Sequence, residues 1–489
     1  MIDLTLNEKI LKKAVKRARE QNIIIPTFNE QRNPDAIPIS IQKELSDLSL
    51  WEIHPRNLYR ITWKNEPKDR GGRYSPSPNY IELPPELTGV EARIIALIGK
   101  WFPTGSHKVG ATFGCLVPRL VTGQFDPTSQ VAVWPSTGNY CRGGAYDATL
   151  LACKSLAILP EEMSQERFKW LKSVAGEIIS TPGGESNVKE VFDKCWELKK
   201  ERGEKIVIFN QFDEFGNHLW HHEVTGPAMQ EVFEKEQKNS KLRGVCLTTG
   251  SAGTLGAADY LKSIYPLSKT AAGESLQCPT MLQNGYGYHR IEGIGDKHIP
   301  WIHNTKQTDF VIAIDDQDCM NLLRLFNEPK GKQYLFREGI PEYMINSLPL
   351  LGISSIANML MAIKFAKYYE LTRQDVVLTV FTDSVEMYTS RLRELNMRHG
   401  EYSEMRAAID FHRSLQSMKT DSMLELRYTD KQRLHHLKYF TWVEQQGKSV
   451  EELNQQWVND EYYWGSIHQQ AEKIDELIIK FNEQVNLLK

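Results

Sequence analysis

The sequence has no long hydrophobic run and no excess of charge of either sign. Its longest apolar stretches, such as VVLTVF at residues 376–381, fall well short of the roughly 18–20 residues that a helix needs to cross a bilayer. The 59 Lys and Arg residues nearly balance the 62 Asp and Glu residues, which leaves a formal net charge of −3. Because no positive excess attracts a polyanion, we expect neither nucleic acid nor a membrane as a partner.

Cysteine, proline and glycine are also sparse. The seven cysteines include no CxxC pair, so neither a zinc ribbon nor a thioredoxin-like site is indicated, and we expect no metal. An odd number of cysteines in a long chain is typical of reduced thiols, which predicts a cytoplasmic protein. The 32 glycines and 22 prolines are too few for a collagen-like or low-complexity chain. The first twenty residues lack the apolar core of a secretory signal, and their acidic residues argue against a mitochondrial presequence.

What the sequence does contain is a repeated pattern of a short apolar run, a polar or Gly-rich turn and a helical stretch, between about residues 95 and 385. Continuous apolar strands that alternate with amphipathic helices predict a mostly parallel sheet covered on both faces. The fold class is therefore α/β with doubly wound, mostly parallel sheets. The expected strands are 131–134, 155–159, 178–180, 206–209, 245–248, 310–314 and 376–381.

The two ends of the chain depart from this pattern. We expect residues 1–91 to form an N-terminal extension, a helix followed by irregular segments, and residues 391–489 to form an all-helical C-terminal extension around a core of residues 92–390. An apolar stripe with steps of four and three marks the last helix: Ile467, Ala471, Ile474, Ile478, Phe481, Val485 and Leu488. The stripe indicates either a helix docked on its own domain or a seam between two subunits.

Turns at the carboxyl ends of parallel strands are where such folds bind ligands. The first turn with suitable chemistry is TGSHK, which places Lys108 in the first turn of a helix. The helix macrodipole and partial burial both lower the pKa of such an amine, which suits it to Schiff-base chemistry. Taken alone, a plain surface lysine is the alternative interpretation.

Two further turns could hold anions at helix starts. PSTGNY, residues 135–140, offers backbone N–H groups, two hydroxyls and an amide that suit a carboxylate, or it is a structural Asx turn. TGSAGT, residues 249–254, has the glycines, hydroxyls and helix start of a phosphate cradle, or it is a generic Gly-rich turn. The second segment lacks a Walker ending and fails the GxGxxG pattern, which argues against nucleotides.

The remaining candidates are weaker. GISS, residues 352–355, could bond a buried heteroatom through a hydroxyl or simply cap the helix that follows. His218, His221 and His222 have a metal-like HxxHH spacing, which we interpret as packing or solvent-exposed residues.

The four turns, in this order, resemble those of the fold-type II pyridoxal-phosphate enzymes, most closely the cysteine synthase and cystathionine β-synthase branch. The resemblance covers roughly residues 92–392 and continues between the turns in Asn210-Gln211-Phe212, Thr225-Gly226-Pro227, GYHRIEGIGDKHIP and FTDSVEMYTSR. It implies a tryptophan synthase β-like fold with two α/β subdomains and pyridoxal 5′-phosphate as the cofactor.

The resemblance also implies a role for individual residues. Lys108 would carry the cofactor as the internal aldimine and then move the substrate α-proton. Asn139 would bond the cofactor 3′-oxygen, and Ser354 would meet the pyridine nitrogen, where a hydroxyl favours elimination from Cβ over transamination. The cofactor phosphate would lie on Gly250, Ser251, Ala252, Gly253 and Thr254. The substrate carboxylate would be bound by Ser136, Thr137 and Gly138, helped by Gln211.

The sequence departs from the branch after the lysine, in the segment after Gly295, and at Ile356, which breaks the family's Ser-Ser-Gly. Val109-Gly110 follow the lysine where Asp-Arg is usual, and Asp296-Lys297-His298 replace a small residue, Gly and Phe in a segment that borders the substrate. A charged wall formed by Asp296 implies a different side chain, leaving group or nucleophile.

The resemblance implies β-elimination or β-replacement on a serine- or cysteine-type amino acid through an aminoacrylate, as in a cysteine synthase or a cysteine desulfhydrase. We expect this amino acid as the small-molecule partner and a homodimer as the assembly. The alternatives are a serine or threonine ammonia-lyase, a pyridoxal-phosphate-binding protein that no longer catalyses, and a nucleotide-binding α/β protein.

Overall fold

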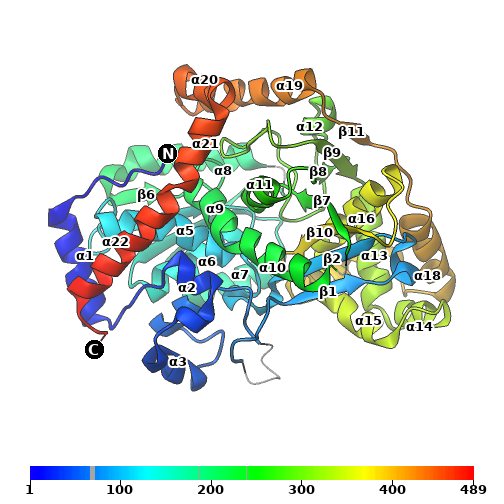
Figure 1. The fold of residues 1–489 in the computed structure, drawn as a ribbon, viewed down its shortest axis with the longest axis horizontal. Coiled ribbons are helices and arrows are strands. Elements are labelled where there is room, and N and C mark those ends of the chain that lie inside the picture. The colour runs from blue at the N-terminus through cyan, green and yellow to red at the C-terminus, as the bar shows by residue number, and fades with distance from the viewer. Residues whose placement is uncertain (67–71, 186, 238, 489) are drawn as a thin grey trace.

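The computed structural model describes residues 1–66, 72–185, 187–237 and 239–488 (Figure 1). Within these ranges the strands form a sheet of seven, in the order β1-β2-β10-β7-β8-β9-β11, and a sheet of four, in the order β5-β4-β3-β6. The strands are β1 (Tyr80–Leu83), β2 (Arg93–Ile98), β3 (Val131–Pro135), β4 (Lys154–Pro160), β5 (Glu177–Thr181), β6 (Ile206–Ile208), β7 (Lys241–Thr248), β8 (Lys269–Ser275), β9 (Phe310–Ile314), β10 (Asp375–Phe381) and β11 (Met423–Glu425).

Helices pack against both sheets: α11 and α16 against the larger one, α6 and α8 against the smaller one. No helix in the described ranges is both long enough and apolar enough to span a bilayer. The α-helices are α1 (Glu8–Glu20), α2 (Phe28–Arg32), α3 (Ile39–Ser46), α4 (Pro85–Thr88), α5 (Lys108–Thr122), α6 (Asn139–Leu150), α7 (Gln165–Val174), α8 (Val188–Arg202), α9 (Phe215–Trp220), α10 (Gly226–Glu236), α11 (Leu255–Ile264), α12 (Thr280–Gln283), α13 (Asp316–Asn327), α14 (Pro329–Arg337), α15 (Glu342–Ser347), α16 (Ile353–Tyr368), α17 (Thr389–His399), α18 (Glu404–Phe411), α19 (Tyr428–Lys438), α20 (Val450–Val458), α21 (Asp460–His468) and α22 (Gln470–Val485).

Strand pairing confirms the predicted class of fold. It is parallel throughout the smaller sheet and across β2, β10, β7, β8 and β9 of the larger sheet. The antiparallel strands β1 and β11 form its two edges. Every residue of β9 and β10 is buried, as expected for strands that run through the middle of a covered sheet.

Four strands were missed by the sequence pattern: β1, β2, β8 and β11. The sequence of β8, KTAAGES, is small and polar rather than continuously apolar, yet the strand is central and pairs with β7 and β9 on its two sides. The prediction of an all-helical C-terminal extension is wrong at β11, whose three residues add to the free edge of β9. A strand of three residues is too short to leave a periodic signal.

The apolar stripe of the last two helices is buried within the chain itself. Ile467, Ile474, Ile478 and Val485 are all fully buried, and only Leu488 at the end of the stripe is largely exposed. Helix α22 packs against α1 and α5, and Figure 1 shows the red C-terminal helix beside the blue N-terminal one. Of the two interpretations, the structure supports the helix docked on its own chain.

Asn482 gives a test of this docking. Its side-chain oxygen accepts the Ile25 N–H at 3.0 Å, and its nitrogen donates to the Ile25 carbonyl at 2.8 Å. We expect Asn482→Ala to lower the free energy of unfolding by about 1–3 kcal/mol, because it leaves two buried backbone groups unpaired. Urea denaturation measures this, with the exposed Asn454→Ala on α20 as the control; equal stability of the two variants would contradict the prediction.

Candidate active site

The turn after β7 combines close backbone packing with the start of a helix. It spans residues 249–254, and α11 begins directly after it at Leu255. Ala252 has a φ of +62°, and a Cβ on Gly253 would lie 2.0 Å from Asn217 Oδ1. Free N–H groups at such a helix start, with hydroxyls beside them, suit a phosphate. The turn therefore has the geometry of an anion site.

The amine of Lys108 lies against this turn. Lys108 is the first residue of α5, and its Nζ donates a hydrogen bond to Ser251 Oγ at 3.0 Å. Burial lowers the pKa of the amine from 10.5 to about 8, and the nearby carboxylate of Asp296 partly opposes this shift. A neutral amine is the nucleophilic form. The structure thus brings the expected lysine and the expected phosphate turn together.

Asp296 has a free oxygen in the same region. Its Oδ2 has no hydrogen-bond partner among the described residues, and a Cβ on Gly250 would lie 3.4 Å from that atom. Burial raises the pKa of Asp296 to about 7, while the charge of Lys108 acts in the opposite direction. The carboxyl group can therefore exist in both protonation states near neutral pH.

Asn217, which the sequence analysis did not single out, connects two predicted segments. Its Nδ2 donates to Ser251 Oγ and to the backbone carbonyl of Gln211, both at 3.0 Å. Asn217 lies on α9, so this helix holds the segment of Gln211 against the phosphate turn. No motif marked Asn217, because only the fold brings it to the turn.

The turn between β3 and α6 is held by residues distant in sequence. Ser136 Oγ accepts the Gly138 N–H at 2.9 Å, and the Thr137 hydroxyl donates to Glu185. A Cβ on Gly138, whose φ is +154°, would lie 2.5 Å from the Cδ of Arg167. Burial raises the pKa of Glu185 to about 8. A second protonatable carboxyl group, not predicted from the sequence, therefore adjoins the expected carboxylate-binding turn.

Asn139 meets a buried carboxylate, Asp383. Asp383 Oδ2 accepts hydrogen bonds from Asn139 Nδ2 and from the Tyr388 hydroxyl, both at 2.7 Å. The other oxygen, Oδ1, is without a partner in the described part of the chain, and a Cβ on Gly352 would lie 1.9 Å from it. Burial raises the pKa of Asp383, and Arg167 opposes this rise. The aspartate lies in FTDSVEMYTSR, which the sequence analysis quoted without assigning it a role.

The two serines at the start of α16 differ in their contacts. Ser355 donates its hydroxyl to the backbone carbonyl of Asp383 at 3.3 Å. Ser354 is buried, and its hydroxyl makes no hydrogen bond to any described residue. Of the two, Ser354 is the one with a hydroxyl available to a ligand.

The three histidines of the HxxHH segment turn to different partners. His221 Nδ1 lies 2.9 Å from Thr225 Oγ1, and His222 Nδ1 lies 2.8 Å from the carboxylate of the glutamate that follows it. His218 Nε2 lies 3.0 Å from Nε2 of His468 in α21. His218 and His221 are fully buried, and because the three rings have different partners they do not form one site.

Comparison with known proteins agrees with this geometry. Residues 101–332 match the family model described as "Pyridoxal-phosphate dependent enzyme". The chain is 32% identical over 289 residues to the cysteine synthase of Staphylococcus aureus (strain Mu50 / ATCC 700699), a match over 59% of this chain and 84% of the relative. It is 26% identical to the cystathionine beta-synthase of Saccharomyces cerevisiae, over 63% of this chain and 59% of that protein.

Solved structures show the same fold. A hydrogen sulfide-producing enzyme from Fusobacterium nucleatum aligns with a TM-score of 0.54 at 24% identity, over 64% of this chain and 96% of that one. The chain belongs to the family of pyridoxal-phosphate dependent enzymes, in its cysteine synthase branch. It is therefore an enzyme, and its cofactor is pyridoxal 5′-phosphate.

The residues present fit that cofactor. The Lys108 amine, whose pKa is lowered to about 8, reaches its neutral form more easily than an ordinary lysine and suits an aldehyde. The helix start at Gly253, where the space for a Cβ is already filled, suits the close approach of a phosphate. The hydroxyl of Ser354, free of partners among the residues described, suits a ring nitrogen.

Gly253→Ala tests the cradle. Because its Cβ would lie 2.0 Å from Asn217 Oδ1, the turn or Asn217 must move. We expect the Kd for pyridoxal phosphate to rise about tenfold or more, equivalent to about 1.4 kcal/mol. Equilibrium titration by absorbance measures it. Gly465→Ala, where a Cβ meets nothing within 4 Å, is the matched control, and unchanged affinity in Gly253→Ala would contradict the assignment.

Proposed function

We propose that this enzyme catalyses β-elimination or β-replacement on a serine- or cysteine-type amino acid. The observation that carries the proposal is the Lys108 amine, 3.0 Å from a hydroxyl of the phosphate turn and with its pKa lowered to about 8. The cysteine synthase and hydrogen sulfide-producing enzyme named above support the class of reaction. A serine or threonine ammonia-lyase is the alternative within the same chemistry.

When bound, pyridoxal phosphate supplies the electron sink that allows loss of the α-proton and of the β-substituent. In this proposal Lys108 holds the cofactor and then takes and returns the α-proton. The turn at 249–254 binds the phosphate, Asn139 and Ser354 orient the ring, and Gln211 assists the turn at 136–138 with the substrate carboxylate.

Two buried carboxyl groups next to these residues can act as proton donors. The pKa of Asp296 is raised to about 7 and that of Glu185 to about 8, and the charge of Asp296 contributes to the shift at Glu185. Both can carry a proton near neutral pH, which is the form that donates to a departing oxygen or sulfur. We place Asp296 at the β-substituent and Glu185, through Thr137, beside the carboxylate turn.

We also propose that the chain divides into three parts, residues 1–91, 92–390 and 391–489. The proposal further includes a homodimer and a cytoplasmic location. Burial of all seven cysteines as free thiols supports a reducing compartment. The close docking of α22 on α1 supports extensions that pack on each other as one unit.

A panel of amino acids tests the reaction. We expect cysteine or O-acetylserine to be turned over, with sulfide released or incorporated, and threonine to give no oxo-acid. Lys108→Ala should lose both turnover and borohydride-stable attachment of the cofactor, because the attached amine is gone. Oxo-acid release from threonine at rates above those for cysteine would favour the ammonia-lyase, and full activity of Lys108→Ala would overturn the assignment.

The pH dependence of cofactor attachment tests the environment of Lys108. Burial favours the neutral amine, so attachment should accelerate as the pH rises through about 8 and level off above it, rather than rise through 10.5. Asp296→Asn removes a negative charge that favours the ammonium, so its midpoint should move to lower pH. Stopped-flow absorbance measures the rates, and the exposed Asp193→Asn is the control. An unshifted midpoint in Asp296→Asn would show that the charge of Asp296 does not act on the Lys108 amine.

A further inference from the structure

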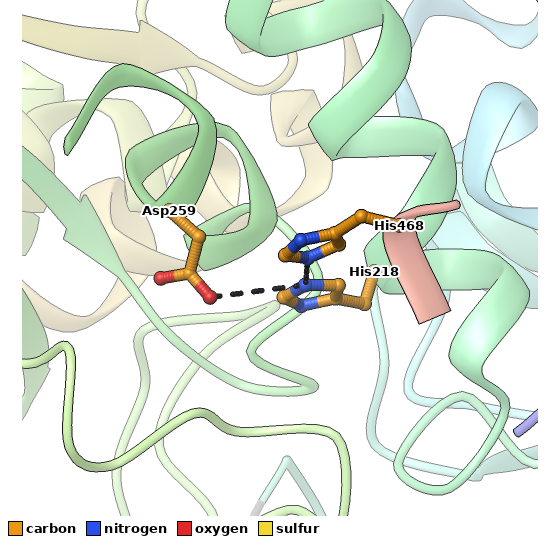
Figure 2. Close-up of side chains that lie close together, drawn as sticks. All are labelled: His218, Asp259 and His468. Atoms are coloured by element: carbon orange, nitrogen blue, oxygen red, sulfur yellow. Dashed lines mark hydrogen bonds and ion pairs between the residues drawn. The ribbon is translucent and has the colours of Figure 1, made fainter. Parts of the chain in front are cut away.

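Three side chains from different helices converge where the C-terminal extension meets the core. His218 lies on α9, Asp259 on α11, and His468 is the last residue of α21. Figure 2 shows the two imidazole rings beside each other, with the Asp259 carboxylate directed toward His218. Of the three residues, the sequence pattern marked only His218, because the other two lie far from it along the chain.

The distances suit a small cation. One ligand atom from each residue lies within 4.8 Å of the other two. His218 Nε2 is 3.0 Å from His468 Nε2 and 3.8 Å from Asp259 Oδ2. Ligand atoms at about 2.0–2.2 Å from one zinc ion lie about 3–4 Å from each other in tetrahedral geometry.

Two of the three side chains are buried, His468 is half-buried, and the carboxylate lacks a close ion-pair partner. Asp259 is 8% exposed, and His218 is fully buried. Within the described ranges Asp259 has no Lys or Arg ion-pair partner; it accepts a hydrogen bond from Asn304 Nδ2 at 3.0 Å. A buried carboxylate without a counter-charge is costly, and a cation would offset that cost.

An unused polar atom gives a second, independent sign of a ligand. Asn304 Oδ1 is buried and has no hydrogen-bond partner among the residues described, and the nitrogen of the same amide donates to Asp259. The ring of His222 stacks on His468 with centroids 3.7 Å apart and fixes its plane.

We propose that His218, Asp259 and His468 bind a divalent transition-metal ion, with Zn²⁺ as the ion that two imidazoles and a carboxylate suit best. The fourth position is left to Asn304 Oδ1 or to water. The expectation of no metal rested on the absence of a CxxC pair and on the interpretation of the HxxHH histidines as packing or solvent-exposed residues; the proposal departs from it at His218.

Such a site would connect the C-terminal extension to the cofactor turn. Asn217, the neighbour of His218, donates to Ser251 of that turn, and α11, which carries Asp259, begins directly after it. A metal ion would therefore join α21 to the two helices that border the turn. The role is structural, because none of the three residues takes part in the proposed reaction.

Metal binding by the intact enzyme tests this inference. Holoenzyme treated with a chelator and freed of it by gel filtration is titrated with Zn²⁺ in a calorimeter. We expect one site per chain in the wild type, a Tm that rises with Zn²⁺, and a Co²⁺ derivative with visible d–d absorption. His468→Gln and Asp259→Asn should lose saturable binding, and the exposed His436→Gln on α19 should retain it.

The wild-type titration decides the proposal by itself. If the metal-free wild type binds no Zn²⁺ stoichiometrically, or if both ligand variants bind it as tightly as His436→Gln, the histidine pair is a hydrogen bond between neutral rings and the site is refuted. Near-UV circular dichroism checks the fold of each variant. Should a ligand variant fail to fold, Asn304→Ala replaces it, with affinity expected to fall about 10–100-fold through loss of the partner that orients Asp259.

Discussion

The hydrogen bond between Lys108 and Ser251 is the constraint on which the rest of the site depends. It joins the start of α5 to the turn that precedes α11, so a single contact spans two helix starts that follow different strands. A buried amine is expensive unless it is paired, and burial also lowers its pKa. The amine can reach the aldehyde of pyridoxal phosphate, whose phosphate the turn would hold, only while both helix starts keep their positions.

Glycine contacts hold the three helices together. A Cβ on Gly114 of α5 would lie 2.3 Å from the carbonyl of Gly216 on α9, and a Cβ on Gly256 of α11 would lie 2.3 Å from another carbonyl of α9. The backbones of α5 and α11 therefore both pack directly on α9. Since Asn217 on α9 also donates to Ser251, one short helix fixes the relative position of the lysine and the phosphate turn.

The sequence predicted what short-range patterns encode. Continuous apolar runs identified strands such as β10, and the turn chemistry around Lys108 and residues 249–254 led to the family. The polar strand β8 was missed because its burial comes from its neighbours rather than from its own residues. Asn217, Glu185 and Asp383 were missed for a related reason: each reaches the site through a contact between segments far apart in the chain, which leaves no local signal.

The buried carboxylates of the enzyme differ in how their charge is offset, and this difference separates their roles. Asp383 lies 4.0 Å from the Arg167 guanidinium, which stabilises it as part of the framework. Asp296 has the Lys108 amine as its opposing charge, so its protonation follows the state of the site. Among the described residues Asp259 has no lysine or arginine in an ion pair with it; it has an amide, two imidazoles and the more distant charge of Lys262. Framework and reaction account for the first two carboxylates, and the bound ion that we propose would supply the third with a positive charge.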